Sequence, residues 1–295
     1  MNRWQKFTDW CRAMPQYVAP QHGLSRLMHR LAASERPWLA QRLIRTLMAH
    51  YPIDLRDALE PEPTHYRSLN AFFTRALRPG ARPLPADPLA FVSPADGILN
   101  QCGVLTDGRI LQAKGRDYAV SELLATPGAT ADPFQNGVFG TIYLAPHNYH
   151  RVHAPCDCTI TEIIYVPGDL FSVNPRTAAT VPNLFARNER VVLLCSSAHG
   201  ELAIVLVGAM LVGSMTLACW DLASFYRKRC FNRQAFRPGL PLQRGAELGR
   251  FNMGSTVILV LGRQDVTWDE QARVGQPVKV GQALGRWRAL ATQGE

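Results

Sequence analysis

A glycine, a serine and a threonine stand together at Gly254-Ser255-Thr256, and an apolar, β-branched run follows them. A serine that follows a glycine can attack its own peptide bond, because glycine has no Cβ to obstruct the attack or the bent backbone that it requires. The pattern indicates self-cleavage between Gly254 and Ser255, with Ser255 as the precursor of a catalytic group. A turn that leads into a strand at residues 256–261 is the other interpretation.

Such a cleavage needs a base for the serine hydroxyl and a carboxylate that orients the base. Three of the eight histidines of the chain lie within seven residues, at His147, His150 and His153. Asp96, in the Pro-Ala-Asp-Gly segment at residues 94–97, is the strongest carboxylate candidate. Asp-Gly is also ordinary turn chemistry, so a purely structural role for Asp96 stays open.

The same histidines raise the question of a metal site. On a helix, a spacing of three would place them on one face, where they could bind a metal. Pro146 and Pro155 bracket the segment and leave room for only a short helical turn. The nearby Cys156-x-Cys158 pair lacks the second ligand pair of a zinc site. We therefore predict no metal.

Positive charge is concentrated at the start of the chain. The net charge is +9, and the first 50 residues hold eight basic residues against Asp9 and Glu35. A basic segment of this kind is typical of contact with nucleic acid or with an anionic membrane surface.

Apolar residues in this basic region recur at helical spacing, which predicts two amphipathic helices. The stripes are Leu24, Leu27, Met28 and Leu31, followed by Leu39, Leu43, Ile44, Leu47 and Met48. They could pack on the core of the protein or lie in a membrane interface. Arginines interleaved with leucines, without a recognisable nucleic-acid motif, favour a membrane over nucleic acid.

A proline-rich connector at residues 79–88 separates this region from a different pattern. Before it, residues 66–78 read as a further short helix, and after about residue 90 short Val/Ile-rich runs predict strands. The predicted strands cover residues 98–99, 104–105, 110–113, 140–144, 159–165, 190–195, 201–207 and 256–261. We predict an α+β protein, with helical residues 1–80 and a mainly β catalytic domain of barrel-sandwich-hybrid type at 81–295.

The seven cysteines are odd in number and irregularly spaced, which favours reduced thiols in a cytosolic compartment. No apolar stretch resembles a secretory signal or reaches the 18 residues of a membrane span.

Several segments together resemble the phosphatidylserine decarboxylases, pyruvoyl-dependent membrane enzymes of the bacterial type. The segments are Met253-Gly254-Ser255-Thr256, residues 149–155, 93–97, 66–73, 114–118, 171–175 and 207–209, in that family's order and spacing. Two positions depart from the family pattern. Met253 replaces a leucine of similar volume. Asn148 stands where the family often has aspartate, so the role of the carboxylate depends more on Asp96.

The resemblance implies roles for four residues. Ser255 is the cleavage nucleophile and becomes the pyruvoyl group, His153 is its base, and Asp96 is the carboxylate beside that base. His150 corresponds to the histidine of the decarboxylation step. Cleavage would leave a β chain of residues 1–254 and an α chain of residues 255–295.

The implied reaction converts phosphatidylserine to phosphatidylethanolamine in phospholipid biosynthesis. The pyruvoyl group made from Ser255 would form a Schiff base with the substrate amine and act as the electron sink. The implied enzyme is peripheral to the cytoplasmic side of the cell membrane, contains both cleaved chains and does not bind nucleic acid; further oligomerisation is open. The alternatives are a non-catalytic membrane-binding β module and a histidine-ligated metallohydrolase.

Overall fold

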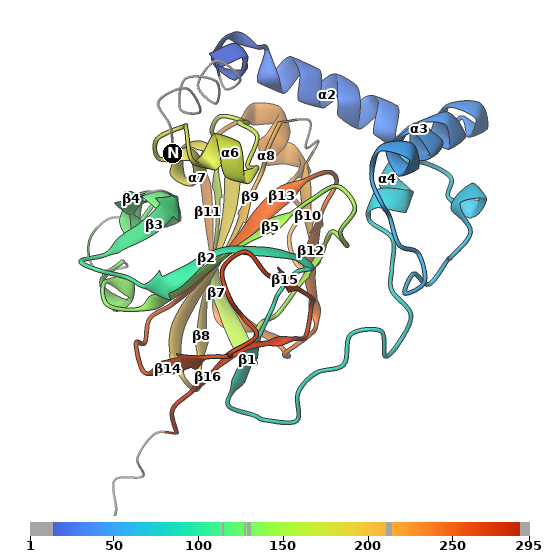
Figure 1. Cartoon of the computed structure of the whole chain (residues 1–295). Coiled ribbons are helices and arrows are strands. Elements are labelled where there is room, and N and C mark those ends of the chain that lie inside the picture. Colours follow the sequence, from blue (N-terminus) through green and yellow to red (C-terminus); the bar gives the residue numbers. More distant parts are fainter. Residues whose placement is uncertain (1–13, 114, 127, 129–130, 211–213, 290–295) are drawn as a thin grey trace, which may run out of the picture.

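The computed structural model describes residues 14–113, 115–126, 128, 131–210 and 214–289. Residues 14–18 are helical, two long helices and one short helix follow them, and sheets with short helices come next (Figure 1). The helices are α2 (Gln21–Ala32), α3 (Pro37–His50), α4 (Leu69–Phe73), α5 (Val120–Leu124), α6 (Pro175–Ala178), α7 (Leu184–Arg187) and α8 (Ala223–Lys228).

The strands form one large antiparallel sheet and smaller ones. The large sheet has the order β11-β7-β8-β9-β13-β5-β2-β15, and the smaller ones are β1-β16-β14, β10-β12-β6 and β3-β4. Their bounds are β1 (Ala90–Val92), β2 (Gly97–Val104), β3 (Arg109–Ala113), β4 (Arg116–Ala119), β5 (Val138–Leu144), β6 (Arg151–His153), β7 (Cys158–Val166), β8 (Arg190–Ser197), β9 (Gly200–Val207), β10 (Met215–Leu217), β11 (Asn232–Leu242), β12 (Glu247–Phe251), β13 (Ser255–Leu261), β14 (Val266–Trp268), β15 (Pro277–Val278) and β16 (Ala283–Trp287).

Strand β13 lies inside the large sheet, between β5 and β9. All seven of its residues are buried. Val257 and Leu259 belong to one apolar cluster and Ile258 and Val260 to another, so successive side chains enter the cores on opposite faces of the sheet. Because both faces are covered, the strand reads as one continuous apolar run rather than an alternating one.

The N-terminal helices make a third, smaller core. Ala32, Ile44, Leu69 and Phe72 are its buried centre. Met253, from the segment just before β13, packs against this cluster. The helical region is thus in direct contact with the predicted cleavage segment.

The two predicted apolar stripes have different environments. On α3, Ile44 is buried and Leu43 and Leu47 pack against the small core, as expected for a stripe that faces protein. On α2, the buried residues are Gln21, Ser25 and Ala32, and Met28 of the predicted stripe packs against the small core, whereas its leucines Leu24, Leu27 and Leu31 are exposed. The core interpretation therefore fits α3 and not the leucine stripe of α2.

The predicted α+β class is confirmed, and each predicted strand coincides with or touches a strand of the structure. The large sheet is open in the described residues, with β11 and β15 at its ends. The helix expected at residues 66–78 is wrong in length, because only α4 forms there. Beyond Thr74 the chain turns to pair Leu77 with Ala58, and the buried Arg75 reaches the carbonyl oxygens of the histidine segment.

Close strand packing beside Asp96 gives a stability test. A Cβ on Gly97 would lie 2.4 Å from the carbonyl oxygen of Tyr143 on β5, whereas a Cβ on Gly103, in the same strand β2, would meet only a ring carbon of Phe139 at 3.8 Å. We expect Gly97→Ala to lower the free energy of unfolding by about 1–3 kcal/mol. Gly103→Ala is the matched control and should cause no such loss in urea unfolding. Equal losses in the two variants would contradict this explanation.

Candidate active site

Ser255 is the first residue of β13 and pairs with Leu144 of β5. Its side chain is fully buried, and its hydroxyl has no hydrogen-bond partner in the described part of the chain. Leaving a buried hydroxyl unpaired costs about 1–3 kcal/mol, so such groups call for an explanation, of which a chemical role is one. A Cβ on the preceding Gly254 would meet nothing within 4 Å, so crowding does not explain the glycine.

The segment that leads into Ser255 is held by Asn252. Its backbone N–H donates to the carbonyl of Ser214 at 3.0 Å. Its side-chain amide donates to the hydroxyls of Ser214 at 2.6 Å and Thr216 at 3.3 Å. These bonds fix the connection between β12 and β13 against the neighbouring strand β10.

His150 is fully buried and lies next to this connection. Its backbone carbonyl accepts from Phe251, four residues before Ser255. The ring Nδ1 lies 2.8 Å from the carbonyl oxygen of Asn148, so Nδ1 carries the proton, and Nε2 is left as an acceptor without a partner in the described residues. Burial, with the nearby Arg75 guanidinium, lowers the pKa of His150 to about 3, and its imidazole is neutral.

His153 ends strand β6 and has a partner at each ring nitrogen. Nδ1 lies 2.8 Å from the carbonyl oxygen of Gly245 and therefore donates, while Nε2 accepts from the Tyr149 hydroxyl at 3.0 Å. Burial lowers the pKa of His153. Its imidazole is neutral and correctly polarised for a base, but its basic nitrogen faces Tyr149.

Asp96 makes its contacts with Arg82 and with the backbone. The guanidinium of Arg82 donates to both carboxylate oxygens, at 3.1 and 2.6 Å, and also to Asp57 at 2.8 Å. The backbone N–H of Val280 donates to Asp96 at 2.8 Å. These charge-assisted bonds raise the pKa of Arg82 and lower that of Asp57.

The structure brings the predicted residues to one region without joining them into a chain of hydrogen bonds. The backbone N–H of His153 donates to the carbonyl oxygen of Pro94, which places the histidine beside the Asp96 turn. A small cavity of about 160 Å³ has Asp96, Tyr149 and Arg75 in its wall. His153 contacts neither the Asp96 carboxylate nor the Ser255 hydroxyl by a hydrogen bond.

Three residues of this region were not singled out from the sequence: Arg75, Arg82 and Tyr149. Arg75 is only 4% exposed and donates to the carbonyl oxygens of His147 and Asn148. Arg82 belongs to the proline-rich connector, whose composition indicates only a linker. The tyrosine lies in the histidine segment itself, and only its distance to His153 shows its role.

Asn148 has a structural task that does not need charge. Its side-chain oxygen accepts from the Ala145 N–H at 2.8 Å and closes the turn before His150. Its backbone oxygen accepts from both His150 and Arg75.

The described residues contain no group of three or more His, Cys, Asp or Glu side chains arranged to bind a metal. None of the helices in the described part combines the length and apolar character needed to cross a membrane.

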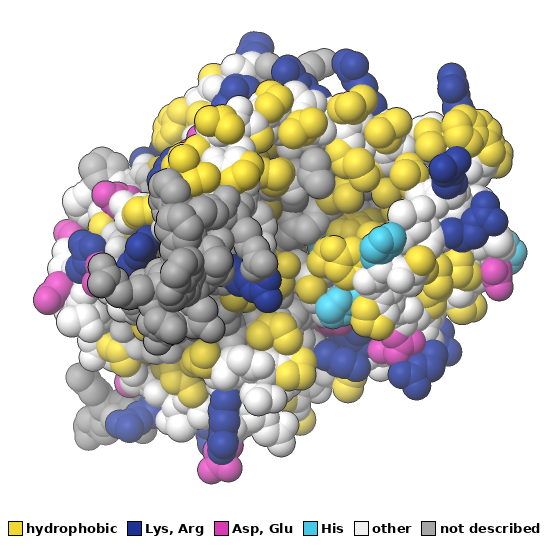
Figure 2. Space-filling model, turned by 45° about the horizontal axis from the view of Figure 1, so that its top comes forward, with side chains coloured by type: hydrophobic (Ala, Val, Ile, Leu, Met, Phe, Trp, Pro, Cys, Tyr) yellow, Lys and Arg dark blue, Asp and Glu magenta, His cyan; other side chains and the backbone are white. Residues whose placement is uncertain are grey.

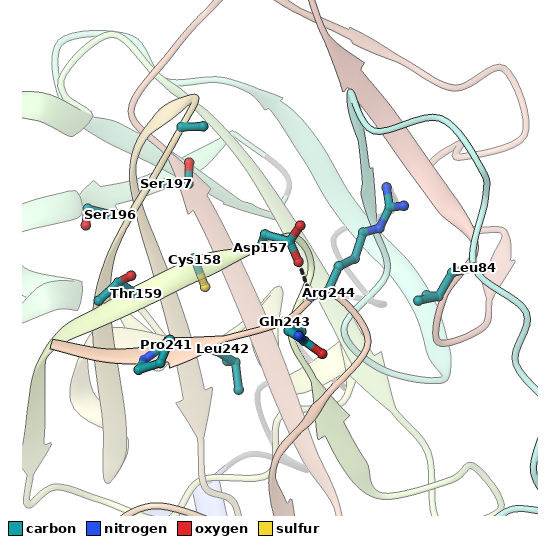
Figure 3. Close-up of a pocket in the computed structure, with 11 residues that line it drawn as sticks. Leu84, Asp157, Cys158, Thr159, Ser196, Ser197, Pro241, Leu242, Gln243 and Arg244 are labelled. Carbon is teal, nitrogen blue, oxygen red and sulfur yellow. Dashed lines mark hydrogen bonds between the residues drawn. The ribbon is translucent and has the colours of Figure 1, made fainter.

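A second hollow, of about 710 Å³, lies around Arg244 and Asp157, and Figure 3 shows its lining. It contains none of the four predicted catalytic residues. Its contribution to the site is indirect, because the Arg244 N–H donates to Asp157 at 2.7 Å and its guanidinium binds three backbone carbonyls. These bonds hold the turn whose next residue, Gly245, accepts from His153.

Comparison with known proteins decides the family. A family model described as phosphatidylserine decarboxylase matches residues 69–286. The chain belongs to the phosphatidylserine decarboxylase family. A further family model, described as PSD, matches residues 11–52 and so covers much of the basic helical region.

Curated relatives of this family match over nearly their whole length. A phosphatidylserine decarboxylase proenzyme of Stutzerimonas stutzeri is 46% identical over 283 residues, 95% of both chains. Proteins of the same name from Azotobacter vinelandii and Bordetella pertussis are 47% and 44% identical, over 92% and 94% of this chain and 96% and 95% of their own. Neither the non-catalytic membrane-binding β module nor the histidine-ligated metallohydrolase finds support in these matches.

The buried, neutral His150 predicts a pH dependence of stability. Between pH 6.5 and about 3 the unfolded chain binds a proton at this residue that the folded chain does not. The contribution of His150 to the free energy of unfolding therefore falls by roughly 1 kcal/mol for each pH unit between 6.5 and about 3. We expect His150→Gln to remove this contribution, so that the variant loses less stability than the parent between pH 7 and 5 in urea unfolding.

The comparison is best made with Ser255→Ala in both proteins, so that each is one continuous chain. His153, whose pKa is also lowered, is present in both and cancels. Parallel curves of stability against pH would show that His150 is not held neutral by the fold.

Proposed function

We propose that this chain is a self-processing decarboxylase that converts phosphatidylserine to phosphatidylethanolamine. The observation that carries the proposal is Ser255, a buried hydroxyl without a partner in the described residues, placed directly after Gly254 at the start of a central strand. The chain belongs to a family whose relatives above are named proenzymes, which fits a maturation step at this bond.

Maturation would be a reaction of the chain with itself. The Ser255 oxygen attacks the carbonyl carbon of Gly254, and the amide becomes an ester with a free amine at residue 255. Elimination then removes the Cα proton of residue 255 and breaks the bond between the serine oxygen and its Cβ, which releases Gly254 as a carboxylate and leaves dehydroalanine at position 255. Addition of water to that residue expels ammonia and gives the pyruvoyl group.

His153 is the proposed base for the attack, and Asp96 the proposed carboxylate of the same unit. His153 must first give up the hydrogen bond from Tyr149, because that bond occupies the nitrogen that would take the serine proton. Asp96 must likewise share its carboxylate with a partner other than Arg82 and Val280. Cleavage would therefore begin with a rearrangement of these side chains.

The residues around position 255 fit a pyruvoyl group. The Ser255 side chain is enclosed and has no hydrogen bond in the described residues that its conversion would break. A pyruvoyl carbonyl supplies an electron sink for the loss of CO₂. The neighbouring His150, with an open acceptor nitrogen, is the proposed residue that takes up a proton and passes it to the substrate carbon.

Replacement of the nucleophile is the direct test. We expect wild-type protein to give two fragments on a denaturing gel, corresponding to residues 1–254 and 255–295. Ser255→Ala removes the attacking oxygen, so this variant should stay one chain of 295 residues and release no CO₂ from phosphatidylserine. Intact-mass measurement of the small fragment should show a pyruvoyl group in place of its first residue.

Three further variants serve to separate the roles in that experiment. Asp96→Asn and His153→Ala should block cleavage, whereas His150→Ala should cleave and then decarboxylate at least 100-fold more slowly. An active wild-type protein that remains a single intact chain would refute the proposal.

The exposed face of α2 supports a membrane location. Leu24, Leu27 and Leu31 are 40%, 56% and 37% exposed, and Trp38 at the start of α3 is 64% exposed. Figure 2 shows hydrophobic side chains gathered over the helical part of the molecule, with basic side chains, drawn in dark blue, around them. An apolar face bordered by cations is the composition of a helix that lies in a membrane interface.

We further propose that the enzyme is peripheral to the cytoplasmic side of the cell membrane and works as the assembly of its two cleaved chains. The described cysteines are all free thiols, in keeping with a reducing compartment.

The membrane proposal predicts a loss of binding when the leucine face is made polar. We expect Leu27→Ser with Leu31→Ser to weaken binding to vesicles that contain phosphatidylserine at least tenfold, measured by co-sedimentation, because two leucines would no longer enter the bilayer. Val104→Ser with Leu111→Ser, at exposed residues of β2 and β3, is the matched control. Equal binding of the two double variants would exclude α2 as the membrane face.

A further inference from the structure

A cavity lies between α2 and the strand β10, which we call the α2–β10 cavity. Its volume is about 870 Å³, within the range of small-molecule sites. Its lining includes Arg26, His29 and Arg30 from α2, with Ser214, Thr216 and Trp220 opposite. None of the predicted catalytic residues lines it.

The wall formed by α2 is basic. Arg26, His29 and Arg30 are spaced by three and four residues, so they share one face of the helix. Neither arginine makes an ion pair within the part of the chain that the structure describes. Two guanidinium groups without an acidic partner there leave donors that an anion could fill.

The opposite wall is mixed and is connected to the cleavage segment. The hydroxyls of Ser214 and Thr216 accept from Asn252, which stands three residues before Ser255. Three residues of extended chain span about 11 Å at most. Tyr226, which also lines the cavity, holds β10 by accepting from the Met215 N–H at 2.9 Å.

Apolar side chains complete the lining and are continuous with the surface. Leu222 and Met215 are buried in the cavity wall, and Trp220 packs on the core beside them. The exposed Leu27 and Leu31 lie on the same helix as the basic residues. The cavity thus offers two arginines against one carboxylate, that of Asp221, together with hydroxyls and apolar surface.

We propose that the α2–β10 cavity binds the phosphodiester of a glycerophospholipid, with Arg26, His29 and Arg30 on the phosphate oxygens and Trp220 and Leu222 beside the glycerol and the first acyl carbons. The inference deepens the proposed function, on which it rests, by giving the substrate phosphate a place beside the segment that ends at Ser255. Free phosphate shares the anionic chemistry but would leave the apolar lining unfilled.

Binding of a monomeric lipid separates this site from general attraction to a membrane. The probe is dihexanoylphosphatidylserine below its micelle concentration, titrated by calorimetry into the full-length Ser255→Ala chain, which cannot turn it over. We expect Arg26→Gln with Arg30→Gln to weaken binding at least tenfold. Inorganic phosphate should compete for the site but bind at least tenfold more weakly than the lipid.

The matched control is Arg176→Gln with Arg273→Gln, which removes the same charge from exposed positions outside the cavity. It should change lipid binding less than twofold, and both double variants should keep the parent's thermal midpoint. Equal weakening in the two pairs, or no weakening in the first pair, would overturn the site. Phosphate that binds as tightly as the lipid would overturn the phospholipid assignment.

The two proposals fail in different ways. If the wild-type chain cleaves itself and decarboxylates its substrate, but lipid affinity does not change when Arg26 and Arg30 are replaced, only the α2–β10 site is refuted. Lipid binding that depends on these arginines, in a protein whose wild-type chain never cleaves, would remove the self-processing enzyme and leave the site.

Discussion

The rest of the structure depends on the burial of β13 on both faces of the large sheet. A strand covered on both sides must be apolar throughout, and residues 257–261 meet that demand. Ser255 and Thr256 are the exceptions, and their hydroxyls are unpaired among the described residues. The packing that stabilises the sheet therefore also excludes water from the Ser255 side chain and holds its hydroxyl oxygen in place. A reactive hydroxyl at this buried position needs a base from a neighbouring segment of the same chain, because water is excluded.

Around this strand, the polar groups are held by contacts with distant parts of the sequence. Arg82 of the proline-rich connector holds Asp96, which in turn accepts from Val280 near the end of the chain. Arg75 and His150 share the carbonyl oxygen of Asn148. The shared acceptor sets the His150 tautomer, and burial, together with the Arg75 guanidinium, disfavours a second proton on its ring. The same low-dielectric surroundings make each of these charges sensitive to the position of its partner.

The sequence predicts those parts of the site whose residue types or local spacing are distinctive by themselves. The run after Ser255 reads as a strand because its burial is complete, and the histidines and Asp96 stand out by type and spacing. Strand β11 carries no such signal, because its residues 232–242 are mostly exposed, lie at a sheet edge and include prolines. The arginines are harder still. Arg75 lies 72 residues from the first carbonyl that it binds, so only the fold shows its role. On α2 the periodicity was informative about the helix but not about which side faces the protein.

The distribution of the last forty residues among the sheets has a consequence for the lifetime of the molecule. Strands β13 and β15 belong to the large sheet, and β14 and β16 belong with β1. A cut before Ser255 would leave the segment that bears the reactive group woven through two sheets, with β5 and β9 as unpaired edges if it ever left. Exchange of a spent segment for a fresh one would require unfolding most of the protein. A molecule whose group at position 255 is damaged could thus be replaced only by synthesis of a whole new chain, so the lifetime of the prosthetic group would set the lifetime of the protein.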